Sequence, residues 1–275
     1  MRALLTSTFR TRTLAWLTQR PWIPDTRLRS VEFESADGIR LTGWYGDRPG
    51  AAATIILCHG VPGDKRDMAG LAGALIDAGF AVLAFDFRNW GESARTAVTL
   101  GHRELQDILG AVVLVERLAG PRRRIGIVGL SMGAAAAILA AARSPAIKAV
   151  VADSSYARLD HAAERVARRL GGPLAVLAWR RARRVGERLI GVPLASVAPV
   201  EAIAAISPRP VLIIHGKRDR LTDVGDAHAL YRACGEPKAL WVVERAGHAR
   251  TRRVGIEEYH RRVIGFFEEH LSASA

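Results

Sequence analysis

The chain has 275 residues, 49% of them apolar, which is enough for a substantial core and excludes an intrinsically disordered protein. Its formal net charge of +13 is compatible with a nucleic-acid partner, but the arginines are scattered and no aromatic RNA-binding signature accompanies them, so no such partner is expected. The two cysteines, Cys58 and Cys234, lie in unrelated contexts without the neighbours of a zinc site, and we expect reduced thiols.

Residues 1–29 form a basic N-terminal extension. Arginines and threonines interrupt its apolar runs before they reach the roughly seven residues of a signal sequence, so export is not predicted and a cytoplasmic location is expected. We interpret the segment as a short amphipathic helix docked on the body of the protein. Peripheral membrane contact through this extension or through the helical insertion described below is the less favoured alternative.

After the extension, alternating apolar and polar residues predict two antiparallel strands on either side of Asp37-Gly38, a dipeptide that favours a tight hairpin turn. Apolar runs without alternation follow, and such runs are typical of strands buried on both faces. Together they predict an α/β protein with a mostly parallel, doubly wound sheet of about eight strands. The runs are ATIILCH, FAVLAFDF, RIGIVGL, IKAVVAD, PVLIIHG and KALWVVERAGH, and helices are predicted near 66–78, 102–119, 132–143, 223–233 and 253–271.

Residues 156–205 break this alternation. The interval reads as helical throughout and is too long for an ordinary connection of about two to six residues. We therefore predict a helical cap, inserted between the core segments 30–155 and 206–275 and lying over the strand ends. Its arginines are interpreted as solvent-facing, with an anionic acyl carrier or a membrane as the alternative: Arg165, Arg168, Arg169, Arg180, Arg181, Arg183, Arg184 and Arg188.

A single serine lies between two glycines in Gly129-Leu130-Ser131-Met132-Gly133. The stretch fits the pattern G-x-S-x-G directly after a predicted strand and before a predicted helix, which is the context of a nucleophile elbow. In so tight a turn, side chains at Gly129 and Gly133 would collide with the backbone. Ser131 is therefore a candidate nucleophile, and a serine that merely caps the helix is the alternative.

With this motif, residues 30–271 resemble the α/β-hydrolase superfamily, and within it the serine esterases and serine aminopeptidase-like members that carry a helical cap. Three further stretches carry the resemblance: CHGVPGD, DFRNWGES, and HGKRDRLTD with a later AGHAR. The resemblance implies a site that needs no metal and no cofactor. It also implies that Asp86 and Arg88, in the second stretch, fix a loop and take no part in catalysis.

A serine hydroxyl becomes nucleophilic only when an imidazole removes its proton, and a buried carboxylate must hold that imidazole in one tautomer. His248 follows the last predicted strand and is assigned as the base. Asp219, four residues after His215, matches the family's position for the acid. Asp153, at the end of the preceding strand, is the alternative acid, because some members of the fold place it there.

The resemblance also implies an oxyanion hole made by the backbone N–H groups of Val61 and Met132. His59 and Gly60 open the loop that carries Val61 and are assigned to its support. The prediction is then a serine hydrolase that cleaves an ester or thioester of a small to medium apolar acyl group through an acyl-enzyme. The expected partner is a small-molecule ester, thioester or amide. The alternative functions are a serine peptidase and a non-catalytic binding protein of the same fold. The oligomeric state is left open.

Overall fold

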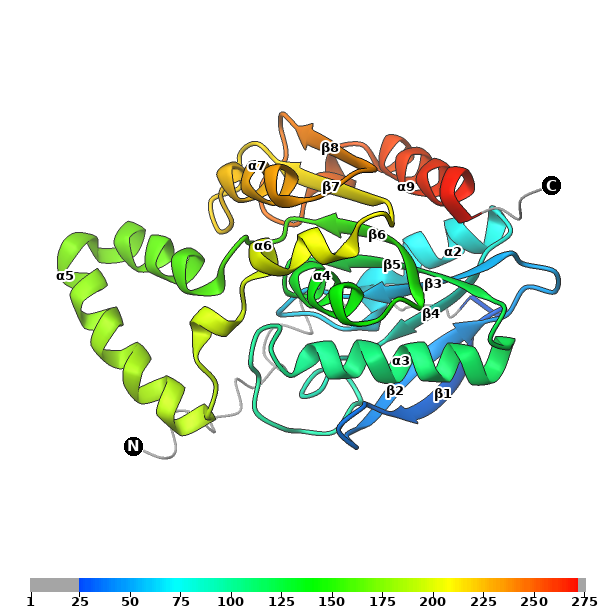
Figure 1. The fold of residues 1–275 in the computed structure, drawn as a ribbon, viewed down its shortest axis with the longest axis horizontal. Coiled ribbons are helices and arrows are strands. Elements are labelled where there is room, and N and C mark those ends of the chain that lie inside the picture. The colour runs from blue at the N-terminus through cyan, green and yellow to red at the C-terminus, as the bar shows by residue number, and fades with distance from the viewer. Residues whose placement is uncertain (1–24, 272–275) are drawn as a thin grey trace.

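The computed structural model describes residues 25–271, and an eight-stranded sheet runs through it in the order β1-β2-β4-β3-β5-β6-β7-β8 (Figure 1). β2 pairs antiparallel with β1 and β4, and the other neighbouring strands are parallel. The predicted fold, with its antiparallel opening pair, is confirmed. The strands are β1 (Arg29–Glu34), β2 (Arg40–Gly46), β3 (Ala53–Cys58), β4 (Ala81–Phe85), β5 (Arg124–Leu130), β6 (Ile147–Asp153), β7 (Val211–Gly216) and β8 (Lys238–Val243).

Helices cover both faces of the sheet. The side chains of β3 alternate between two cores: Ile56 contributes to one, and Ile55 and Leu57 to the other. Because both faces are covered, the central strands are apolar at nearly every position and show no alternation in sequence. On the first face lie α3 (Glu104–Ala119), α4 (Met132–Arg143) and α7 (Val224–Ala233), and on the second α2 (Ala69–Asp77) and α9 (Ile256–Leu271) (Figure 1).

Two predicted helices are divided in the structure. The helix predicted near 66–78 begins as a 3-10 turn, η3 (Lys65–Met68), before α2. The helix predicted near 253–271 is split into α8 (Thr251–Val254) and α9 at Gly255, whose backbone is extended with φ −166° and ψ 84°. The split matters for the site because α8 begins three residues after His248.

The interval between β6 and β7 consists of α5 (Leu159–Ile190), η4 (Leu194–Ser196), α6 (Pro199–Ala202) and η5 (Ile203–Ile206). α5 breaks at Gly171 and Gly172, which have non-helical backbone angles just before Pro173. Up to the break the helix extends away from the sheet, on the side of the carboxyl ends of the parallel strands, and beyond the break it turns and runs across that side (Figure 1). This is the interval predicted as a cap, and its role as a separate cap stays a prediction.

Two further predictions concern the N-terminal helix and contact with a membrane. The predicted N-terminal helix falls within residues 1–24, outside the described residues. Across residues 25–271 no single helix is both long and apolar enough to cross a membrane; one pair bent by 77°, Leu159–Ile190 with Leu194–Ile206, passes that test of length and composition only when taken together.

Buried charges hold the loop that follows β4. The Asp86 carboxylate accepts hydrogen bonds from the backbone N–H (2.8 Å) and the Nζ (2.6 Å) of Lys65, a side chain that is only 5% exposed. Arg88, 2% exposed, donates to the fully buried Asp107 at 2.6 Å and also to Asp37. These side chains bind the polypeptide itself, which is the structural role expected for Asp86 and Arg88.

Candidate active site

Ser131 lies in the turn between β5 and α4 with φ +54° and ψ −115°, a backbone conformation that residues other than glycine rarely adopt. A Cβ atom at Gly129 would lie 2.4 Å from the carbonyl oxygen of Gly133. One at Gly133 would lie 2.5 Å from the carbonyl oxygens of both Cys58 and His59. Only glycine fits these two positions, and their close contacts allow α4 to begin directly at the end of β5.

Replacement of Gly133 by alanine is expected to lower the free energy of unfolding by about 1–3 kcal/mol, because the added methyl group meets backbone atoms that cannot rotate away. Urea unfolding measures the change. Gly70→Ala in α2 is the matched control: its Cβ would meet nothing within 4 Å, so a helical alanine there is expected to be neutral or slightly stabilising. A Gly133→Ala protein as stable as the wild type would contradict the close approach.

A chain of hydrogen bonds joins the three predicted catalytic residues. Ser131 Oγ lies 2.8 Å from His248 Nε2, and His248 Nδ1 lies 2.8 Å from Asp219 Oδ2. The three residues come from the turn after β5, the loop after β8 and the loop after β7, which meet because the carboxyl ends of parallel strands share one edge of the sheet. The arrangement has the geometry of a nucleophile, a base and an orienting acid.

Asp219 is a fully buried carboxylate whose environment favours its charged form. Burial alone would raise its pKa, but hydrogen bonds from His248, from the backbone N–H of Leu221 and from Thr222 outweigh burial and hold the pKa below its usual value. The ionised carboxylate can only accept a hydrogen bond. The Nδ1 atom of His248 therefore carries the proton, and its Nε2 is left free to accept the proton of Ser131.

Asp153, the alternative acid, lies at the end of β6 and is fully buried. Its carboxylate accepts hydrogen bonds from Thr251 Oγ1 at 2.5 Å and Ser154 Oγ at 2.9 Å. Within the described part of the chain it forms no hydrogen bond with His248, and burial raises its pKa despite both hydroxyl donors. Asp153 thus ties β6 to α8, and the carboxylate that contacts the imidazole is Asp219.

The loop after β3 passes beside the nucleophile. A Cβ atom at Gly60 would lie 3.3 Å from the Cβ of Ser131, and Val61, the predicted oxyanion donor, is the next residue. His59 is buried and fixes this loop, with Nδ1 2.8 Å from the carbonyl oxygen of Gly60 and Nε2 accepting from the N–H of Phe87. Burial lowers the pKa of His59, although the Gly60 carbonyl opposes this, so the ring is neutral. The structure therefore gives His59 a supporting position.

The other predicted oxyanion donor, Met132, is the first residue of α4 and follows the nucleophile directly. Its side chain is buried in the core between the sheet and α4, so only its backbone can serve the site. Donors at a helix N-terminus point away from the helix and carry the positive end of its dipole. Met132 thus has the location required of an oxyanion donor.

Thr222 is a site residue that the sequence did not reveal. Its Oγ1 lies 2.8 Å from Asp219 Oδ2, 3.1 Å from His248 Nδ1 and 3.2 Å from the carbonyl oxygen of Ser154. The hydroxyl therefore holds the carboxylate in the orientation that meets the imidazole. A threonine three residues after the acid is an ordinary loop residue, and nothing in its sequence context distinguishes it.

The arginines of the predicted cap are paired in part. Half of these eight arginines form ion pairs with carboxylates of the described chain, as expected for the polar faces of helices. Across residues 25–271, no group of three or more His, Cys, Asp or Glu side chains is placed to hold a metal ion. The ion pairs are those of Arg165 with Asp226, of Arg168 and Arg180 with Glu164, and of Arg183 with Asp160 and Glu187.

The fold and the geometry around Ser131 together define the class of α/β hydrolases, as the sequence predicted. The sequence profile of one family, described as serine aminopeptidase, S33, matches residues 49–191. The chain belongs to this family of α/β hydrolases.

Known proteins support this assignment. The chain is 30% identical over 240 residues to the uncharacterized protein YqkD of Bacillus subtilis, covering 85% of this chain and 77% of YqkD. It is 30% identical over 236 residues to the uncharacterized protein YfhR of Escherichia coli K12, covering 83% and 74%. Among solved structures, the Pyrococcus furiosus esterase Pf2001 superimposes with a TM-score of 0.74 at 28% identity, covering 91% of this chain and 97% of the esterase.

Proposed function

We propose that the protein is a serine hydrolase that cleaves esters or thioesters of small to medium apolar acyl groups. The observation that carries the proposal is the continuous chain of two 2.8 Å hydrogen bonds from Ser131 through His248 to the buried Asp219. A protein that only binds ligands on this fold has no need for a serine in a strained turn aligned with an imidazole and a carboxylate.

In the proposed mechanism, Ser131 Oγ attacks the acyl carbon while His248 Nε2 takes its proton, and the ionised Asp219 stabilises the imidazolium. The N–H groups of Val61 and Met132 bind the oxyanion, and each such donor lowers the barrier by roughly 2.7–4 kcal/mol. The imidazolium then gives its proton to the leaving oxygen or sulfur as the bond from the acyl carbon breaks. Water hydrolyses the acyl-enzyme by the same steps.

The second candidate is an aminopeptidase, which the description of the family suggests. Such an enzyme must recognise the positively charged amino terminus of a peptide, which carboxylates do best. The depression beside His248 is lined by five arginines and by no aspartate or glutamate, so its positive potential disfavours a cationic substrate at this site as a whole. This observation, together with the likeness to the Pf2001 esterase, favours an acyl ester or thioester as the substrate.

A panel of p-nitrophenyl esters from acetate to dodecanoate, assayed beside aminoacyl p-nitroanilides, tests the proposal. We expect kcat/KM to be highest for acyl chains of intermediate length and at least about tenfold lower for dodecanoate, because each misplaced methylene group costs binding energy in the transition state. The anilides should be hydrolysed more slowly than the preferred ester. If an aminoacyl anilide is hydrolysed fastest, the result contradicts the proposed esterase and supports the aminopeptidase.

A further inference from the structure

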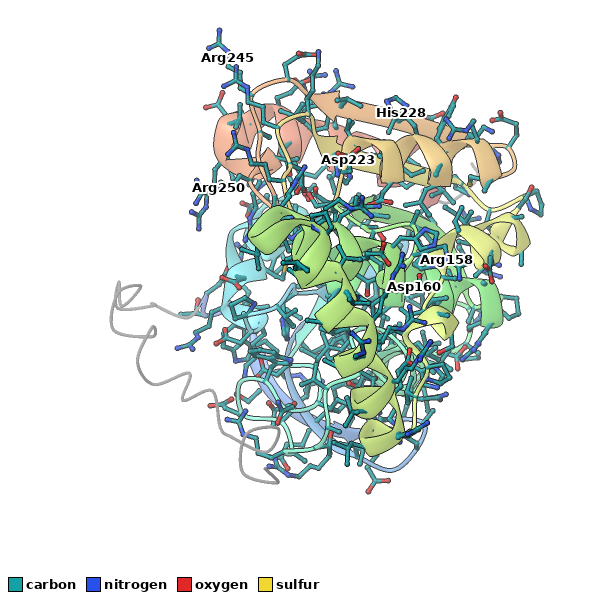
Figure 2. All side chains as sticks on the ribbon, turned by 90° about the vertical axis from the view of Figure 1, so that its left-hand side faces the viewer. Arg158, Asp160, Asp223, His228, Arg245 and Arg250 are labelled. Atoms are coloured by element: carbon teal, nitrogen blue, oxygen red, sulfur yellow. The ribbon has the colours of Figure 1, made fainter. Side chains whose placement is uncertain are left out.

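A depression with a volume of about 620 Å³ opens beside His248, between the loops after β7 and β8 and the short helix α8. Figure 2 looks onto this end of the molecule, where α5 crosses in front and the side chains of Arg245 and Arg250 project at one side. Five of the nine lining residues are arginines and none is acidic. The lining residues are Arg218, Arg220, Leu221, Arg245, Gly247, His248, Arg250, Arg253 and Val254.

The charge of this depression is not balanced by the protein. Within the described residues, none of the five guanidinium groups is paired with a carboxylate, in contrast to the ion-paired arginines of α5. Two carboxylates that adjoin the lining arginines in sequence are already engaged, Asp219 by His248 and Glu244 by Lys217, each at 2.8 Å. Like charges gathered around a concave surface create a positive potential that attracts anions.

We propose that this depression binds a phosphate group on the leaving-group side of the acyl ester or thioester. The planar guanidinium group of arginine matches phosphate oxygens with two parallel hydrogen bonds, and several arginines suit a multiply charged group better than a single carboxylate. Leu221 and Val254, 55% and 47% exposed, supply apolar surface between the charges. A linker between the phosphate and the reacting carbonyl can pack against this surface.

The position of His248 assigns the depression to the leaving group, and this step rests on the proposed function. The imidazolium must give its proton to the leaving oxygen or sulfur as the bond from the acyl carbon breaks, so that atom departs beside His248. His248 itself lines the depression. The portion of the substrate that follows the leaving atom is thereby directed among the arginines, while the acyl group stays on Ser131.

Two thioesters with the same acyl group test the inference. Butyryl-coenzyme A carries phosphates on its leaving group, whereas butyryl-pantetheine has the same thioester without them. We expect wild-type kcat/KM to be at least about tenfold higher for the coenzyme A thioester at low salt, and the ratio to fall at least about tenfold in Arg250→Gln/Arg253→Gln, mainly through KM. Because the substrates share their reacting group, the ratio cancels any general damage to the active site.

The matched control is Arg117→Gln/Arg122→Gln, which removes two exposed arginines, one in the last turn of α3 and one in the loop that leads to the amino end of β5. Its ratio should equal that of the wild type. Dihexanoyl phosphatidic acid and dihexanoylglycerol form a parallel pair: an arginine-dependent preference in this pair identifies a lipid leaving group, and one in the thioester pair a soluble leaving group. If neither preference depends on Arg250 and Arg253, the inference is wrong.

A binding measurement separates this inference from the proposed function. Calorimetry with coenzyme A and the Ser131→Ala variant should show binding that weakens at least about tenfold when Arg250 and Arg253 are also replaced by glutamine. If the wild type hydrolyses the neutral thioester but no binding depends on these arginines, the inference fails and the proposed function stands. If no acyl substrate is hydrolysed, the proposed function fails, and arginine-dependent binding still supports a phosphate site.

Discussion

Replacement of Ser131 by alanine is expected to lower kcat for a p-nitrophenyl ester by about 10⁴- to 10⁶-fold, because no other group can form the acyl-enzyme. His248→Ala should lower kcat by about the same factor. The double variant should lower kcat little more than either single variant does, since the two residues act as one unit. Steady-state kinetics on the preferred ester of the panel measures all three losses.

Urea unfolding is the control for these variants. In the described structure the Ser131 hydroxyl hydrogen-bonds only His248, so its removal should leave the free energy of unfolding within about 1 kcal/mol of the wild type. A Ser131→Ala protein that is folded and keeps more than a tenth of the wild-type kcat would contradict the assignment of the nucleophile.

Asp219→Asn is expected to reduce kcat by about 10⁴-fold, because the amide can donate a hydrogen bond to His248 Nδ1 and thereby favours the wrong tautomer. Asp153→Asn should reduce kcat by less than about tenfold. Its carboxylate contacts Thr251 and Ser154, and an asparagine oxygen can still accept one of those hydrogen bonds. Kinetics at neutral pH compares the two variants, and the reverse order of effects would move the acid to the end of β6.

Much of the fold was predictable because burial determines where apolar residues occur in the sequence. The central strands are covered by helices on both faces, so their apolar runs show no alternation, and the glycines around Ser131 mark a turn too tight for side chains. The division of the C-terminal helix was not predicted. The periodic spacing of apolar residues continues across Gly255, although the backbone of Gly255 is extended and interrupts the helix.

The site was predictable in its residue types but not in its contacts. Asp153 ends β6 and Asp219 lies in the loop after the neighbouring strand β7, and only the three-dimensional arrangement shows which of them meets His248. The arginines could not be sorted from sequence either, since pairing depends on contacts such as that of Arg165 with Asp226, 61 residues away. The five unpaired arginines of the depression come from two loops and α8, and no local sequence pattern connects these segments.

Labelling with a fluorophosphonate probe, followed by peptide mapping, tests the central claim most directly, because the probe reacts covalently with a serine only where an imidazole activates it. The native protein should take up one probe per chain on Ser131. Labelling should be lost in Ser131→Ala and after heat denaturation. A native protein that takes up no probe, or label that maps elsewhere and persists in Ser131→Ala, would contradict the account of this chain as a serine hydrolase.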